Sequence, residues 1–369
     1  MELAADKQGP EQPLRAPVRF AIIGAGNIAG VHARAMADLT DARVAVVCAR
    51  SEDAGRALAA QCGADWTPEY HEAVSRPDVD AVCVCTPSGA HGEVAIAAAR
   101  AGKHILVEKP LEITLDRIDA VIAAADEAVV KLGCVLPSRF MRGVALAKAA
   151  IQDGRLGKIT LATASVPWYR SQAYYDTGGW RGTWALDGGG ALMNQSIHTI
   201  DLLQWFVGPV DRVSGEVATL SHRMETEDTA AAILSLRSGG IGVVRAGTGC
   251  WPGDRSRIDR HGDRGTISLE DGRIVVWRLM DAAPGEEVQM IGLEAPPGSG
   301  AQDPMGITAD RHRALIADLI DAIYDDRSPA VSGDDSRHAV EIIRAIYASS
   351  RHGRLVALPL AEEALGLRR

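Results

Sequence analysis

The stretch FAIIGAGNIAG (residues 20–30) decides the fold of the first part of the chain. An apolar strand predicted over Val18–Ile23 runs into the glycine turn GAGNIA (residues 24–29), and a helix is predicted over Ile28–Leu39. In such a turn the first glycine permits a tight bend, the second lets the backbone approach a pyrophosphate, and the small third residue allows close packing. The amides at the helix start face the phosphates. We therefore expect cofactor contacts at Gly24, Gly26, Asn27 and Ile28.

The segment that contains this turn alternates between strand and helix patterns as far as residue 137. Further strands are predicted over Val44–Cys48, Ala81–Cys85 and Ile105–Val107, with helices over Glu52–Cys62, Val94–Ala101 and Leu115–Leu132. This alternation predicts a parallel sheet with right-handed crossovers, and continuous apolar strands fit a sheet that is covered on both faces. We expect a Rossmann dinucleotide-binding domain over residues 17–137, preceded by a flexible tail over residues 1–16.

The pattern changes in residues 138–369, where runs of strands are joined by Gly, Asp and Ser turns. A helix is expected over Val144–Asp153, and the glycine run 188–190 opens another within Leu186–Val207. Strands are expected over Lys158–Val166, Val213–Leu220, Thr229–Leu236, Ile241–Gly247, Ser256–His261, Gly265–Leu269 and Arg273–Leu279. A loop over Pro284–Pro304 and helices over Ala309–Asp325 and Ser336–Arg351 complete the chain. Such runs predict a mostly antiparallel sheet in a second α/β domain that binds substrate and mediates oligomerisation.

Composition and charge exclude several classes of protein. The chain has 369 residues and a net charge of -9, which argues against binding to nucleic acid. The sequence has neither an apolar run of about 20 residues nor a secretory signal, so we expect a cytoplasmic protein without a membrane span. The six cysteines are spread out, and Cys83 and Cys85 share one face of a strand. We interpret them as buried free thiols and expect no metal site.

The end of the second strand bears on the choice between NAD and NADP. An NAD site usually places an acid here to bind the ribose hydroxyl, whereas this chain has Ala49 followed by Arg50 and Ser51. A guanidinium matches a 2′-phosphate in charge and geometry. We therefore favour NADP slightly over NAD, with a solvated Arg50 as the alternative.

Glu108, Lys109 and Pro110 follow the fourth strand, at the sheet edge where ligands of open α/β sheets bind. The proline keeps Lys109 out of a helical conformation. A lysine in this place can hold a substrate hydroxyl and stabilise its alkoxide, although a surface salt bridge is an equally good interpretation of Lys109 alone. Thr86, Pro87, His91 and Glu108 are further expected cofactor contacts.

His198 lies four residues after Asn194, so both face one side of a helix. Imidazole titrates near neutrality and suits a general base that takes the proton of a carbinol. Asn194 can only form hydrogen bonds. A lone helical histidine is more often a packed residue, but the lysine and the dinucleotide turn favour catalysis here. We expect Lys109, Asn194 and His198 to form the catalytic group.

With these three motifs the sequence resembles the Gfo/Idh/MocA oxidoreductases, the family of glucose–fructose oxidoreductase and inositol dehydrogenase. The resemblance covers nearly the whole chain from Val18 onward. It implies a Rossmann domain, a second domain with a large open sheet that pairs in dimers or tetramers, and Lys109 and His198 as the catalytic pair. It also implies a reaction at a ring hydroxyl or ketone of a sugar, sugar derivative or cyclitol.

One departure concerns the substrate, because inositol dehydrogenases carry aspartate at the position of Asn194. Asparagine there is similar to members that act on sugars or sugar nucleotides, which weakens myo-inositol as the substrate. Aromatic and arginine side chains that can stack on a pyranose ring and bind its hydroxyls lie upstream. We expect substrate contacts from Trp168, Tyr169, Arg170, Arg181 and Trp184, in addition to Lys109, Asn194 and His198; packing at an interface is the alternative.

Two other functions fit the same motifs. Some relatives use bound NAD transiently to cleave glycosides, so an NAD-dependent glycoside hydrolase is the first alternative. A non-catalytic ligand-binding regulator on the same fold is the second, and the presence of both Lys109 and His198 argues against it.

Overall fold

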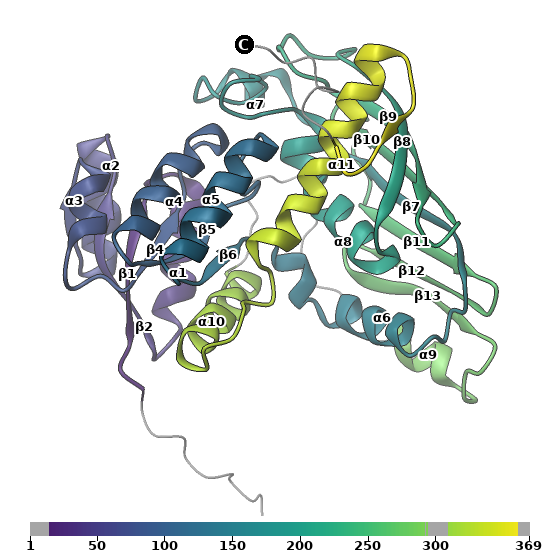
Figure 1. The fold of residues 1–369 in the computed structure, drawn as a ribbon, viewed down its shortest axis with the longest axis horizontal. Helices are drawn as coiled ribbons and strands as arrows, with labels where there is room; N and C mark the ends of the chain where they lie inside the picture. Colours follow the sequence, from purple (N-terminus) through teal and green to yellow (C-terminus); the bar gives the residue numbers. More distant parts are fainter. Residues whose placement is uncertain (1–14, 292, 294–308, 361–369) are drawn as a thin grey trace, which may run out of the picture.

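The computed structural model describes residues 15–291, 293 and 309–360, and it contains two sheets that lie side by side (Figure 1). The first sheet has six parallel strands in the order β3-β2-β1-β4-β5-β6. Its strands are β1 (Val18–Ile23), β2 (Ala42–Cys48), β3 (Asp65–Thr67), β4 (Ala81–Val84), β5 (His104–Val107) and β6 (Leu132–Cys134). This order confirms the Rossmann fold expected from the sequence.

Helices connect these strands and cover both faces of the sheet. They are α1 (Asn27–Ala37), α2 (Glu52–Cys62), α3 (Tyr70–Ser75), α4 (His91–Arg100) and α5 (Leu115–Glu127). The sequence pattern missed the short elements β3 and α3. It also predicted one helix over Leu115–Leu132, which was wrong at its end: the chain turns at Val129, whose φ is 53°, and Leu132 begins strand β6. The apolar pair Val129–Val130 had extended the helical pattern past that turn.

The second sheet has eight strands in the order β13-β12-β11-β7-β10-β9-β8-β14, and every neighbouring pair is antiparallel except β7 and β10. Its strands are β7 (Ile159–Pro167), β8 (Val210–Ala218), β9 (Thr229–Leu236), β10 (Ile241–Gly247), β11 (Arg257–Gly262), β12 (Gly265–Glu270), β13 (Arg273–Leu279) and β14 (Val356–Ala357). The mostly antiparallel open sheet predicted from the sequence is confirmed.

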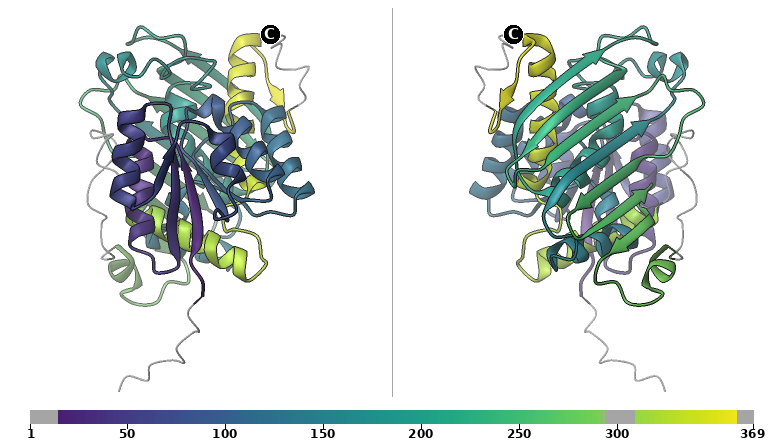
Figure 2. Two further views of the ribbon diagram at one scale, coloured as in Figure 1. Left: turned by 90° about the vertical axis from the view of Figure 1, so that its left-hand side faces the viewer. Right: turned by 90° about the vertical axis from the view of Figure 1, so that its right-hand side faces the viewer.

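Helices cover one face of this second sheet, and the other face is open (Figure 2). The helices that follow the first domain in the chain are α6 (Arg142–Gln152), α7 (Gln172–Asp176), α8 (Ile197–Val207), α9 (Glu286–Ile291), α10 (Asp310–Tyr324) and α11 (Gly333–His352). Helix α9 lies inside the loop expected over Pro284–Pro304; residues 292 and 294–304 of that loop lie outside the described residues. On the open face Leu161, Ile233 and Ile241 remain 40–57% exposed.

The last two helices connect the halves of the molecule. Helix α10 packs on the first sheet, where Leu315 and Leu319 join the core formed around Phe20 and Ile22. Helix α11 contacts α5 and β6 of the first domain as well as α8 and β8 of the second. Strand β6 ends at Cys134 and β7 begins at Ile159, so the chain passes from the first sheet to the second between them, and it returns to the first sheet through α10.

Residues 15 and 16 are also tied to α10, because Arg15 forms ion pairs with Asp321 at 3.1 Å and Asp325 at 3.2 Å. The rest of the tail expected over residues 1–16 lies outside the described residues.

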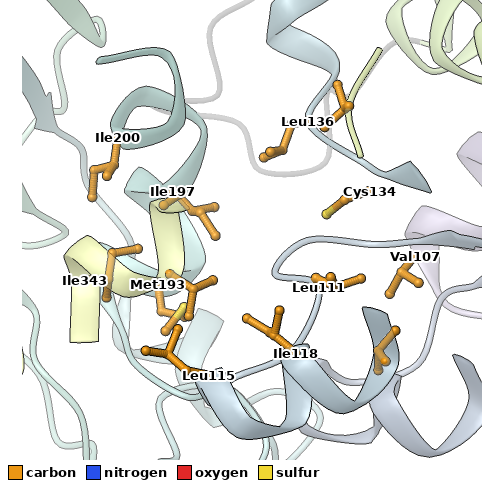
Figure 3. Close-up of a cluster of buried hydrophobic side chains, with 14 of the residues drawn as sticks. Val107, Leu111, Leu115, Ile118, Cys134, Leu136, Met193, Ile197, Ile200 and Ile343 are labelled. Atoms are coloured by element: carbon orange, nitrogen blue, oxygen red, sulfur yellow. The ribbon is translucent and has the colours of Figure 1, made fainter. Parts of the chain in front are cut away.

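One apolar core runs across the junction between the domains (Figure 3). It joins Val107, Leu111, Leu115 and Ile118 of the first domain to Met193, Ile197 and Ile200 of the second, with Ile343 of α11 beside them. A buried ion pair reinforces it: Arg139 donates to Asp201 of α8 from Nε at 2.9 Å and from Nη2 at 2.6 Å. This packing fixes the segment that carries residues 191–200 against the end of β5.

In the part of the chain that the structure describes, no helix is both long and apolar enough to cross a membrane. All six cysteines are free thiols, as expected, but only Cys48, Cys83, Cys85 and Cys134 are buried; Cys62 is half-buried and Cys250 is exposed. The Sγ atoms of Cys83 and Cys85 lie 3.7 Å apart.

Candidate active site

The two turn glycines have different surroundings. Gly24 has a φ of +120°, and a Cβ there would lie 2.5 Å from the carbonyl oxygen of Cys85, so this position has neither the conformation nor the space for a side chain. Gly26 has extended backbone and no described atom within 4 Å of a built Cβ. Ala29 behind it is fully buried. The backbone at Gly26 thus borders open space, as a bound pyrophosphate requires.

The start of α1 is also open to an anion. Among the described residues no side chain caps this helix at Gly26, so its first amides keep their hydrogen-bonding capacity. Asn27 is exposed and Ile28 is half-buried at this end. Unpaired amides and the positive end of the helix dipole favour a phosphate, and the predicted contacts at Asn27 and Ile28 therefore lie where they can be made.

Thr86 and His91 lie at the end of β4, on the same edge. The Thr86 hydroxyl is buried without a hydrogen-bond partner in the described structure, and a polar ligand group would satisfy it. His91 Nε2 lies 2.8 Å from the Thr86 carbonyl and Nδ1 lies 2.8 Å from the Pro110 carbonyl; the neutral ring has one N–H and donates to one of them, according to its tautomer. Burial lowers its pKa. His91 therefore connects the segment after β4, including Pro87, to the loop that carries Lys109.

The end of β2 presents Arg50 to solvent. Ala49 is buried, and its carbonyl accepts a hydrogen bond from Trp66 Nε1 at 3.3 Å. Ser51 is the N-cap of α2, where its hydroxyl accepts from the Ala54 amide at 3.4 Å. Ala49, Arg50 and Ser51 are adjacent in the sequence but have different roles in the structure, and the Arg50 side chain is exposed.

Lys109 extends from the first domain to the second. Its Nζ donates to the backbone carbonyl of Asn194 at 2.7 Å and to Asn194 Oδ1 at 3.3 Å. The neighbouring Glu108 points the other way and accepts from His32 Nε2 at 2.8 Å. Burial lowers the pKa of Lys109, while the charges of Glu108 and Asp187 act in the opposite direction. Among the described residues Lys109 forms no surface salt bridge, which was the alternative interpretation. Its Nζ donates to Asn194 instead.

Asn194 lies in a π-helix, Ala191–Ser196, that leads into α8. The carboxylate of Glu227 holds the start of this turn: it accepts from the Gly190 amide at 3.0 Å and the Leu192 amide at 2.8 Å. A Cβ at Gly190 would collide with the Glu227 carbonyl. The glycine run therefore allows close approach of the protein's own backbone, and π-helical turns of this kind are frequent at functional sites.

His198 begins α8 beside Lys109. Burial lowers the pKa of His198 to about 3, and the charge of Lys109 contributes in the same direction. Its Nδ1 is buried without a hydrogen-bond partner in the described structure. The imidazole is therefore neutral at physiological pH and has an unused ring nitrogen.

The Asn194 side chain belongs to a hydrogen-bonded network of buried polar groups. Its Nδ2 donates to Asp187 Oδ1 at 2.5 Å, and its Oδ1 accepts from Gln195 Nε2 at 3.1 Å. Gln195 Oε1 in turn accepts from Arg170 Nη2 at 2.9 Å, and Gln195 Nε2 donates to the Tyr174 hydroxyl at 2.9 Å. Lys109, Asn194 and Arg170 thus belong to one hydrogen-bonded network. His198 has no hydrogen bond to this network in the described structure.

The other predicted substrate contacts are divided. The Arg170 guanidinium lies over the ring of Trp168 at 4.9 Å, and Arg181 lies over Tyr174 at 4.8 Å, so both border the network. Tyr169 packs instead against Trp251, at 5.0 Å between ring centroids. Trp184 packs edge-on against Tyr347 at 5.2 Å and remains 42% exposed.

The sequence motifs missed three residues of this network, namely Asp187, Tyr174 and Gln195. The acid directly before the glycine run and the glutamine directly after Asn194 were the available signals, but only the folded chain shows that their side chains converge.

A cluster of metal-ligating atoms lies beneath the dinucleotide turn. The ligand atoms of His32, Cys83 and Cys85 lie within 4.8 Å of one another, and all three residues are buried. His32 of this cluster is already hydrogen-bonded to Glu108. We therefore interpret the cluster as a support for the segment that carries Lys109.

Comparison with known proteins agrees with this geometry. A family model described as "Oxidoreductase family, NAD-binding Rossmann fold" matches residues 18–135, and the model "GFO/IDH/MocA C-terminal domain" matches residues 144–268. The chain is 27% identical to myo-inositol 2-dehydrogenase of Thermotoga maritima, over 95% of this chain and 100% of that protein. It is 32% identical to the WlbA dehydrogenase of Bordetella pertussis, whose structure contains NADH and UDP-GlcNAcA, with a TM-score of 0.84 over 94% of this chain and 100% of that one.

The two glycines separate cofactor binding from folding. Gly26→Val adds a side chain in the open space before α1, so we expect NAD(P) affinity to fall about tenfold or more, as for loss of a charged hydrogen bond worth about 1.5–3 kcal/mol. The free energy of unfolding should not change. Gly24→Ala, the matched control, should cost about 1–3 kcal/mol of stability because of its backbone conformation. Calorimetric titration and urea denaturation measure the two quantities. If Gly26→Val binds the cofactor as the wild type does, the site has been misplaced.

Proposed function

The chain belongs to the Gfo/Idh/MocA oxidoreductase family, and from this premise we propose that it transfers a hydride between a nicotinamide dinucleotide and a ring hydroxyl or ketone of a sugar, sugar derivative or cyclitol. The observation that carries the proposal is the contact of Lys109 Nζ with Asn194 across the domain junction. The charge of Lys109 also acts on the buried imidazole of His198 in the second domain, which supports a joint role for the two side chains. Cation, imidazole and open dinucleotide turn are the groups that carbinol oxidation needs.

In the proposed mechanism side chains of the protein accept the proton of the carbinol and stabilise the negative charge that forms on its oxygen. When bound, the dinucleotide accepts or supplies the hydride. The neutral imidazole of His198 accepts the hydroxyl proton, and the Lys109 ammonium stabilises the alkoxide as it forms. Asn194 has no titrating group, and it orients the hydroxyl and the lysine. In the reductive direction the protonated His198 returns the proton to the alkoxide that Lys109 stabilises.

The comparisons support a substrate class more specific than "sugar". Two WlbA dehydrogenases, 32% and 31% identical to this chain, contain UDP-GlcNAcA. The asparagine at position 194 favours sugars or sugar nucleotides over myo-inositol. UDP-linked sugars and sugar acids are therefore the first compounds to test, followed by free sugars and cyclitols, each with NAD and with NADP.

Replacing either reacting side chain should stop turnover without displacing the cofactor. We expect Lys109→Ala and His198→Ala each to lower kcat about 10²–10⁴-fold, the usual cost of losing a proton-transfer group. Lys158→Ala and His71→Ala, which lie outside the site, are the controls. Nicotinamide absorbance follows turnover and calorimetry follows cofactor binding. Near-normal kcat in either variant removes that residue from the mechanism.

For the cofactor we propose a preference for NADP over NAD, although the homologous structures contain NADH. The support is local. Arg50 is exposed at the end of β2, and the described structure assigns its side chain no hydrogen bond or ion pair. The acid that would bind a ribose hydroxyl and repel a phosphate is absent, since Ala49 occupies its place.

Arg50→Ala should therefore weaken NADP selectively, by about 1.5–3 kcal/mol if the guanidinium binds the 2′-phosphate. Arg56→Ala is the control, because Arg56 lies on the following helix α2, where it pairs with Glu52 and covers Trp66. Titration of both cofactors into all three proteins measures the effect. If the wild type binds NAD more tightly and Arg50→Ala alters neither affinity, the preference is for NAD.

We further propose that the open face of the second sheet pairs in a homodimer or homotetramer. Ile241 is in register with Leu161 across β10 and β7, and Ile233 lies on neighbouring β9, so the three exposed apolar side chains form one patch. Exposed apolar patches of this kind mark interaction surfaces.

Charges placed in this patch should dissociate the assembly. Ile233→Glu combined with Ile241→Glu should reduce the mass measured by sedimentation to that of one chain, because a buried unpaired charge opposes association. Val288→Glu, at an exposed position on α9, is the control. A wild type that sediments as a monomer, or a double variant that keeps its mass, contradicts the proposed interface.

A further inference from the structure

We propose that Asp187 is a positioning residue of the hydride-transfer reaction: it fixes the orientation of the Asn194 amide and thereby the face that this amide presents to Lys109. The inference rests on the function proposed above. Asp187 precedes the glycine run, is 1% exposed, and has no assigned role in the motifs described so far.

An amide side chain can present either of two different groups to a neighbour. Asn194 has a donor end and an acceptor end, and either could face Lys109 if nothing held the amide. Asp187 Oδ1 accepts from Nδ2 at 2.5 Å, and an ionised carboxylate can only accept. This contact directs Oδ1 toward Lys109 Nζ, at 3.3 Å. The reverse orientation would bring an NH₂ group against an ammonium.

Asp187 is itself held in place, so it can serve as a fixed reference. Its Oδ2 accepts from the Gly182 amide at 2.8 Å, and its own amide donates to the Thr183 carbonyl at 3.1 Å. Both carboxylate oxygens are thus occupied by donors. An asparagine in its place would have to present an NH₂ group to one of those two donors.

The surroundings add a dependence on pH. Burial raises the pKa of Asp187 to about 6, against the hydrogen bonds from Gly182 and Asn194 and the charges of Lys109 and Arg181. Tyr175 and Tyr347 are the other titratable groups that its charge reaches. Protonation below that pKa adds a donor to the carboxyl and removes the constraint on Asn194. Turnover should therefore fall as the pH drops through about 6.

A double-mutant cycle on the pair tests the inference. We expect D187N to lower kcat about 10- to 100-fold, because small misplacement of reacting groups has costs of that order. N194D should also lower kcat, since it sets two carboxylates against each other. The swapped variant, D187N with N194D, restores one carboxylate against one amide and should recover turnover above both single variants. A role confined to anchoring the loop would make the two effects additive.

Controls separate this inference from the proposed function. D176N changes an exposed carboxylate on the same segment, where it accepts from Gln172, and should leave kcat unchanged. Cofactor affinity should be the same in all variants. If D187N does not fold, comparison of the swapped variant with N194D decides alone. Turnover by the wild type tests the proposed function independently. D187N with normal kcat and pH profile, or a swapped variant no better than the single ones, overturns the positioning role.

Discussion

The hydrogen bond from Lys109 Nζ to the Asn194 carbonyl is the interaction on which the rest of this site depends. Its two ends come from different domains and lie 85 positions apart in the chain. Such a bond has the right length only if both domains hold a fixed relation. The shared apolar core and helix α11 supply that relation. The contacts that stabilise the junction between the domains therefore also align the reacting groups.

The positive charge of Lys109 lies in this partly buried junction and acts on the titratable groups around it. Lys109 and burial together keep His198 neutral, with a pKa of about 3. Glu108 and Asp187 compensate the charge of the lysine from two sides. A neutral acceptor beside a cationic donor is suited to removing a proton while stabilising the anion that remains. The same arrangement makes His198 a weak base. Proton transfer from the carbinol to His198 therefore depends on the charge of Lys109, which stabilises the alkoxide that forms.

The sequence predicted the Rossmann sheet because long apolar strands and a glycine turn are local patterns. It also predicted Lys109, Asn194 and His198 as the catalytic group, since each belongs to a specific motif. The contact of Lys109 with Asn194 agrees with this expectation, and the catalytic roles stay a prediction. The sequence could not predict that α10 returns to the first domain, because an amphipathic helix does not encode which sheet it covers. For the same reason Asp187 and Gln195 escaped notice: their importance arises from a convergence of side chains that no spacing in the chain records.

The central claim is that this junction performs net hydride transfer to or from a ring carbon, and the fate of a labelled hydride tests it most directly. The wild-type protein would be incubated with keto-sugars or keto-sugar nucleotides and a reduced cofactor that carries two deuterium atoms at nicotinamide C4. The account predicts oxidised cofactor and a product in which mass spectrometry finds one deuterium on a ring carbinol carbon. Glycosides cleaved with no net change in the cofactor, or a reduced cofactor that keeps both deuterium atoms with every compound, would contradict it.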